Sequence, residues 1–149
     1  MKPKFKKFNW LVKLITFNWP LAITLSPFGI YVNQKYSTVD DLSPRTKNHE
    51  KIHWKQQMEM MITGFILSLL ASLMFITVSF NIWILLGLLL FPFLFFYLWY
   101  VIEWFVRIFI NGKKAYVSIS FEQEAYDNDD NLNYLDNKKW FRWMKYLKK

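Results

Sequence analysis

The chain has 149 residues and a formal net charge of +8, and 54% of its residues are hydrophobic and 21% aromatic. This composition is unlike that of an ordinary soluble domain and predicts that residues 1–149 form a single domain in or on a membrane. The lack of cysteine excludes a disulfide framework and a cysteine nucleophile, and four scattered glycines exclude a glycine-rich phosphate loop.

The basic residues gather at the two ends of the chain. Five of the nineteen lie in residues 2–13 and six in residues 138–149, interleaved with Trp, Phe or Tyr. Aromatic rings settle at membrane–water interfaces, where lysines meet anionic headgroups. The pattern therefore predicts a lipid bilayer as partner and no nucleic acid, with a basic aromatic interfacial segment at residues 1–20. The spacing of Trp140, Trp143, Met144 and Leu147 predicts a basic aromatic interfacial helix at residues 138–149.

Two elements are predicted in the N-terminal third. Residues 8–19 favour an interfacial or shallowly inserted helix, and a further membrane crossing by residues 8–31 is the alternative. In residues 22–32, β-branched residues favour extended structure while Pro27 and Gly29 interrupt it. A short edge strand or a hairpin is expected there, followed by a polar loop.

A helix is predicted for residues 44–60, with Ser43 as its N-cap and Pro44 in its first turn. Forty-three residues without a charge or a histidine lie between Glu59 and Glu103. Because one crossing needs about 20 apolar residues, residues 61–102 predict a transmembrane helical hairpin. We expect its turn at residues 79–81 and expect the preceding helix to run directly into its first arm.

Positive charges flank this hairpin on both sides, and its turn carries none. Lys47, Lys51 and Lys55 precede the hairpin, and Arg107, Lys113 and Lys114 follow it. Since cytoplasmic loops carry the excess of lysine and arginine, both termini are expected in the cytoplasm. The chain is predicted to be an integral membrane protein of a bacterial inner membrane.

The only two histidines lie in the run His-Glu-Lys-Ile-His at residues 49–53. On a helix, His49 and His53 lie one turn apart on one face and can bind one ion together. Glu50 is then placed to take a proton from metal-bound water, as in the zinc-hydrolase signature His-Glu-x-x-His. The motif predicts Zn²⁺ as cofactor, two ligands and a general base.

A catalytic zinc usually has three protein ligands and one open position. Glu59 cannot be the third ligand, because it lies about 240° around the helix from His53. Glu103 emerges at the cytoplasmic end of the second arm and could approach the motif, although a salt bridge with Arg107 is its simpler role.

Glu122 and Glu124 are the remaining candidates for the third ligand. They lie in residues 113–135, where a strand or helix lead-in up to Ser120 precedes a predicted helix from Phe121 to Leu135. The two glutamates face different sides of such a helix, so at most one of them can meet the histidines.

The residues His49-Glu50-x-x-His53, followed after a hydrophobic hairpin by Glu122-x-x-Ala125, resemble membrane-embedded zinc metallopeptidases of the CaaX prenyl endopeptidase and bacterial membrane heat-shock protease type. The run from Asn48 to Glu59 is also similar to small uncharacterised bacterial membrane proteins. The resemblance implies a mainly α, minimal zincin-like fold and peptidase activity on peptides or membrane proteins. It nominates Glu122 as the third ligand, with Glu124 and Glu103 as second choices.

The sequence departs from that family at Tyr126, where the family has an aspartate that hydrogen-bonds a ligand histidine. Tyr126 or Asp127 would have to take over this contact. Tyr126, Tyr116 and Arg107 are candidates for stabilising the oxyanion. The alternative to a hydrolase is a non-catalytic membrane protein whose metal site is structural or absent, since so short a chain leaves little material for a substrate cleft.

Overall fold

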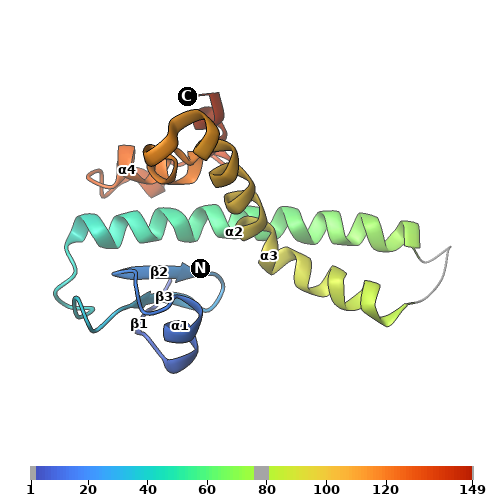
Figure 1. Ribbon diagram of the computed structural model, residues 1–149, viewed down its shortest axis with the longest axis horizontal. Helices are drawn as coiled ribbons and strands as arrows, with labels where there is room; N and C mark the ends of the chain where they lie inside the picture. The colour runs from blue at the N-terminus through green and yellow to red at the C-terminus, as the bar shows by residue number, and fades with distance from the viewer. Residues whose placement is uncertain (1–2, 76–80, 149) are drawn as a thin grey trace.

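The computed structural model describes residues 3–75 and 81–148. Two long helices, α2 (Pro44–Phe75) and α3 (Ile82–Asn111), lie along each other as a hairpin. A small sheet contacts one side of α2, and the short helix α4 (Ser120–Asn128) contacts the other (Figure 1). The predicted mainly α fold with a small β element is therefore confirmed.

The sheet contains β1 (Phe5–Lys7), β2 (Ala22–Leu25) and β3 (Gly29–Val32) in the order β1-β3-β2. Strands β2 and β3 pair antiparallel, which confirms the predicted hairpin. Strand β1 pairs parallel to β3 and was not predicted. A Cβ at Gly29 would lie 2.9 Å from the Lys4 carbonyl oxygen, and its φ of +145° also favours glycine, so this residue permits the close approach of β1.

Helix α1 (Trp10–Ile15) is the only helix within residues 3–32. Its six residues span about 9 Å at the helical rise per residue, so the alternative of a further membrane crossing by residues 8–31 is wrong. The predicted interfacial helix of residues 8–19 is likewise much shorter than expected. Asn9 caps it, accepting a hydrogen bond from the Val12 amide at 2.8 Å.

Helix α2 begins where the capping pattern predicted. The Thr46 amide donates to Ser43 Oγ at 3.0 Å, and the helix then continues unbroken for 32 residues. Helix α3 begins after Asn81, whose side chain accepts from the Trp83 amide. Both helices are long and apolar enough to cross a membrane. Residues 79 and 80 of the predicted turn lie outside the described residues.

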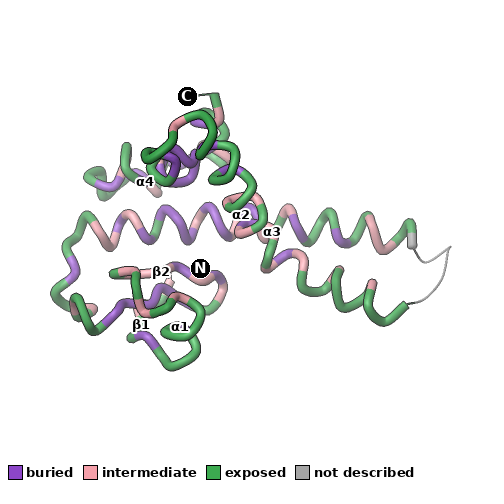
Figure 2. Tube along the Cα trace, viewed as in Figure 1, coloured by how far each residue is buried: buried purple, intermediate pink, exposed green. Residues whose placement is uncertain are grey.

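In the far half of the hairpin, most residues are exposed or only half-buried (Figure 2), and most of these residues are apolar. Leu69, Leu70, Leu73, Leu89 and Leu90 are all more than half exposed. A core helix of a soluble protein would bury such residues against its neighbours. The two ends of the chain lie in the opposite half of the molecule (Figure 1).

Helices α2 and α3 approach closely at Gly64. A Cβ at this position would lie 2.7 Å from Pro92 Cα, so Gly64→Ala must push the helices apart. We expect this variant to lose about 1–3 kcal/mol of unfolding free energy, as overpacked sites do. Gly87→Ala is the matched control, because a Cβ there meets nothing within 4 Å. Thermal unfolding in detergent measures both; equal transition temperatures would contradict the close contact.

The segment after α3 differs from its prediction in two places. The 3₁₀ turns Gly112–Lys114 and Tyr116–Ser118 lead into α4, so of the two alternatives for residues 113–120 the helix lead-in is found and the strand is not. Helix α4 ends at Asn128, so the predicted helix does not reach Leu135. Residues 142–148 form a 3₁₀ helix in place of the predicted interfacial α-helix. Trp143 in this helix is buried against Phe121 with ring centroids 4.4 Å apart. The C-terminal segment therefore contributes to the protein core.

A buried ion pair fixes this segment to α2. Lys138 Nζ lies 2.7 Å from Glu59 Oε1, and both side chains are fully buried. The second oxygen of Glu59 accepts from the Phe141 amide at 3.1 Å. Glu59, which cannot be a metal ligand on this helix face, thus holds the C-terminal segment inside the protein.

Candidate metal centre

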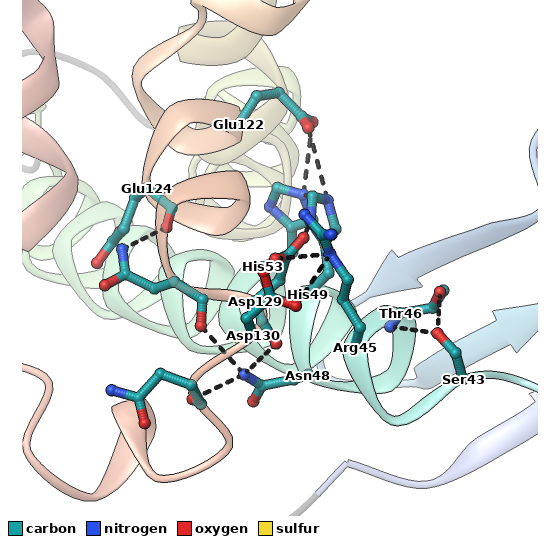
Figure 3. Close-up of polar contacts among 12 residues, drawn as sticks. Ser43, Arg45, Thr46, Asn48, His49, His53, Glu122, Glu124, Asp129 and Asp130 are labelled. Atoms are coloured by element: carbon teal, nitrogen blue, oxygen red, sulfur yellow. Dashed lines mark hydrogen bonds and ion pairs between the residues drawn. The ribbon is translucent and has the colours of Figure 1, made fainter.

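Two turns of α2 and the first turn of α4 bring three side chains together (Figure 3). The Nε2 atoms of His49 and His53 are 3.1 Å apart. The Glu122 carboxylate faces both, with one oxygen 3.6 Å from His49 Nε2 and the other 3.4 Å from His53 Nε2. These three residues form a group that could hold a metal ion.

The spacing of these atoms suits a small tetrahedral ion. Ligand atoms about 2.0–2.1 Å from a tetrahedral zinc lie about 3.3–3.4 Å from one another. The two nitrogens are 3.1 Å apart, and they lie 3.4 and 3.6 Å from different oxygens of Glu122. With one ligand atom from each residue, the three atoms lie within 4.8 Å of one another, so a shift of the Glu122 carboxylate would bring them onto one ion.

The Nδ1 atom of each histidine faces a side-chain oxygen outside the group. This orientation leaves Nε2 of both rings directed at Glu122. His53 Nδ1 donates to Gln56 Oε1 at 2.8 Å. The amide nitrogen of Gln56 donates to the Phe121 carbonyl and to Glu124, so its oxygen must face His53. Such outer contacts fix the tautomer and orientation of a metal-binding histidine.

Asp129 performs the corresponding role for His49. Its Oδ2 lies 3.5 Å from His49 Nδ1, and its Oδ1 lies 2.9 Å from Arg45 Nε (Figure 3). The sequence predicted Tyr126 or Asp127 for this contact. Tyr126 instead packs its ring on His49, 4.7 Å between centroids, and Asp127 is exposed. The sequence did contain a signal for Asp129. It follows Glu122 by seven residues, about two helical turns, so on a helix the two carboxylates lie on the same face.

Helix α4 is held at both ends, and this sets the position of Glu122. At its start, Glu103 accepts hydrogen bonds from the Ser120 amide at 2.8 Å and hydroxyl at 2.6 Å. At its end, Asn48 Nδ2 donates to the backbone carbonyls of Asn128, Asp129 and Asn131 at 3.0–3.2 Å. Asn48, the residue before His49, thus links the end of α4 to α2.

Three site candidates from the sequence have other roles. Glu103, a second choice for the third ligand, caps α4 and pairs with Arg107 at 3.3 Å as the simpler prediction expected. Arg107 also donates to the Tyr146 and Leu147 carbonyls, which directs its guanidinium toward the C-terminal segment. Glu124, the other second choice, is fully buried and accepts from Gln56 and Tyr134.

Buried charge makes the Glu122 carboxylate a ready ligand. Burial alone would raise the pKa of Glu122, but the charge of His53 and hydrogen bonds from His49, His53 and Tyr100 hold this pKa well below its usual range. The Tyr100 hydroxyl donates to Glu122 Oε1 at 2.9 Å. Burial, followed by the charge of Glu122, raises the pKa of Tyr116. Glu122 is therefore ionised, and Tyr116 keeps its proton, at neutral pH.

Glu50 and the metal-binding group face one cleft of about 280 Å³ between the sheet and α3. Thr24 of β2 donates its hydroxyl to Glu50 Oε2 at 2.6 Å, which places the carboxylate. Ala22 and Ile23 line the same cleft, with Tyr97, Tyr100 and Tyr116 on the opposite side. The candidate metal-binding group, the Glu50 carboxylate and the tyrosine hydroxyls thus surround the same cleft.

The contact between Asp129 and His49 gives a direct test of this geometry. Asp129→Asn keeps the side-chain size but removes the charge that orients the imidazole, and loss of such a contact typically lowers metal affinity about 10–100-fold. Asp130→Asn is the matched control: it makes the same chemical change at the adjacent residue, whose side chain is 76% exposed, and should leave the metal affinity unchanged. Competition with a fluorescent zinc chelator measures both; equal affinities would show that Asp129 does not orient His49.

Comparisons with protein-family models, with curated proteins and with solved structures find no match. The assignment of the site therefore rests on its residues and their geometry: a His-His-Glu group that could bind a metal ion, next to two helices that could cross a membrane.

Proposed function

We propose that the chain is an integral membrane zinc metallopeptidase that hydrolyses membrane-proximal peptides at the cytoplasmic surface. The observation that carries this proposal is the convergence of His49, His53 and Glu122 next to Glu50 in one cleft. Two histidines and a glutamate are the ligand set of a catalytic zinc in peptidases. This set also agrees with the resemblance to membrane-embedded zinc metallopeptidases.

Zinc held here would act as a Lewis acid and lower the pKa of a water toward about 7. Glu50 would take the proton from the attacking water and deliver it to the leaving amine. The Thr24 hydroxyl occupies Glu50 Oε2, which leaves the other carboxylate oxygen for this proton. Tyr116 and Tyr126 are the candidates for stabilising the oxyanion, because Tyr116 lines the cleft and Tyr126 packs on His49.

Strand β2 supports a peptide as the substrate. It is an edge strand, and Ala22 and Ile23 line the cleft, so an extended peptide can pair with its backbone. The Gln57 side chain already accepts a hydrogen bond from the Ser26 amide and donates one to the Thr24 carbonyl. The substrate would therefore pair near Ala22, at the end of β2 away from Gln57.

The membrane location rests on the exposed apolar surface of α2 and α3. Water around these side chains would be costly at about 25 cal/mol per Å² of apolar surface, and a hydrocarbon environment removes this cost. The lysines that flank the hairpin favour both termini in the cytoplasm. Since α2 carries both histidines and then continues into its apolar half, the metal centre would lie at the membrane surface.

Metal removal tests the proposal as a whole. Detergent-purified protein should contain about one zinc per chain and cleave members of an unbiased peptide library, as expected for one His-His-Glu centre. A chelator should stop cleavage, and zinc should restore it, with thermolysin as a positive control for the assay. Bound zinc without cleavage would assign a structural site, the non-catalytic alternative. Protein without metal after growth in zinc would contradict the proposal.

A further inference from the structure

Helix α1 and the turn after it expose large apolar side chains on a folded surface. Trp10 is 74% exposed, Phe17 90% and Trp19 84%, and Leu14 is 66% exposed. Val12 is the one buried residue of α1, packing with Phe8 and Tyr31. Because Val12 alone of the α1 side chains is buried, most of the apolar surface of α1 faces outward.

The backbone of the turn is held in the conformation that presents these rings. Phe17 and Asn18 have φ values of 51° and 55°, in the left-handed region that residues other than glycine rarely adopt. The Asn18 amide donates to the Lys13 carbonyl at 3.0 Å, and Asn33 Nδ2 donates to the carbonyls of Asn18 and Pro20, both at 3.1 Å. The exposure of Phe17 and Trp19 therefore belongs to the folded state.

The same region is strongly basic. The first acidic residue of the chain is Asp40. Four exposed lysines lie in β1, in α1 or directly before them, namely Lys4, Lys6, Lys7 and Lys13. Apolar rings bordered by lysines complement a bilayer surface, where the rings enter the headgroup region and the lysines meet anionic lipid.

This surface lies next to the apolar surface of α3. Pro20 and Ile23 line the cleft opposite Phe96 and Tyr97 of α3. The Tyr97 hydroxyl donates to the Thr24 carbonyl at 3.3 Å. At this level and beyond it, α3 still exposes apolar side chains, such as Leu98, Ile102 and Phe105. The sheet that carries α1 thus touches α3 at a level where α3 still exposes apolar side chains.

We propose that residues 10–19 lie in the interface of the bilayer crossed by α2 and α3, with Trp10, Leu14, Phe17 and Trp19 in the headgroup region and the lysines on anionic lipid. The proposal rests on the membrane crossing proposed above and is independent of zinc and catalysis. It places the edge of β2, and with it one wall of the cleft, at the lipid surface.

Because the chain has no cysteine, a single spin label can test this contact in the full protein. Phe17→Cys is labelled and reconstituted in vesicles of phosphatidylcholine and phosphatidylglycerol. Collisions with oxygen report lipid, and collisions with a water-soluble nickel complex report water. Two exposed sites are matched controls: Leu89→Cys on α3 as a lipid reference, and Tyr36→Cys in the loop after β3 as a water reference.

The label at residue 17 should collide with oxygen as the label at residue 89 does, and lose collisions with nickel relative to residue 36. The result should be the same in a His49→Ala background, which separates this proposal from the function of the metal centre. Nickel accessibility equal to that of residue 36 would overturn the proposal. So would protection from both reagents with spin–spin broadening, which indicates a second copy. In vesicles of phosphatidylcholine alone, nickel accessibility at residue 17 should rise; no rise would overturn the role of anionic lipid.

Discussion

Alanine at His49 is expected to abolish stoichiometric zinc binding. Only His53 and Glu122 of the group would remain, one ligand short of the three that a catalytic zinc usually has. One ligand's share of a protein zinc site is about 3 kcal/mol or more, which corresponds to at least about a hundredfold in dissociation constant. Metal analysis of the purified variant, after passage over a desalting column, measures the loss.

Glu122→Ala should lose zinc in the same way. This variant tests whether Glu122 is the third ligand. Asp127→Ala is its control, because it removes a carboxylate from the exposed side of the same helix and should retain zinc. Full retention of zinc in Glu122→Ala, together with its loss in a folded Glu124→Gln variant, would show that the third ligand is wrong. Circular dichroism of each variant separates loss of metal from loss of fold.

Local chemistry made the first half of this site predictable. The separation of His49 and His53 on a helix is set by the helical repeat, and Ser43 and Pro44 define where that helix begins. The prediction needed no tertiary information, and the Nε2 atoms meet as the spacing requires. The β2–β3 hairpin was predictable for a similar reason, since Gly29 and the β-branched residues act within a few positions.

The third ligand depends on contacts that no local pattern contains. Helix α4 has nine residues, and its sequence alone does not tell which face meets α2. Its orientation is set by Glu103 and Asn48, which hold its two ends from other helices. These contacts turn Glu122 toward the histidines and Glu124 toward Gln56.

The C-terminal segment was wrongly predicted for the same physical reason. Trp140, Trp143, Met144 and Leu147 have the spacing of an interfacial helix. Lys138 instead pairs with Glu59, 79 residues away, inside the protein. A buried pair of this kind is costly to break, and it draws Trp143 into the core against Phe121.

This pairing connects the C-terminal segment with the metal centre. Lys138 lies between Glu59 and Glu124, at 2.7 and 3.5 Å. Glu124 accepts from Gln56, and Gln56 accepts from His53. A continuous set of polar contacts thus runs from the C-terminal segment to the imidazole of His53 in the candidate metal centre. Residues 138–148 are therefore part of the structure that orients the site.

Glu50→Gln is expected to remove peptide cleavage while leaving zinc bound. A glutamine cannot accept the proton from the attacking water, and general-base catalysis typically contributes about 10²–10⁴-fold in rate. Glu50 is absent from the His49–His53–Glu122 group, so metal content should be unchanged. Turnover of a cleaved library peptide and metal analysis of the same preparation measure the two effects separately.

Thr24→Val is the companion variant, because it removes the hydroxyl that donates to Glu50 Oε2 at 2.6 Å but leaves the carboxylate itself. It should retain zinc and part of the activity. An unaltered rate in Glu50→Gln would remove Glu50 from the mechanism. Equal rates for Thr24→Val and wild type would show that Thr24 does not position the base.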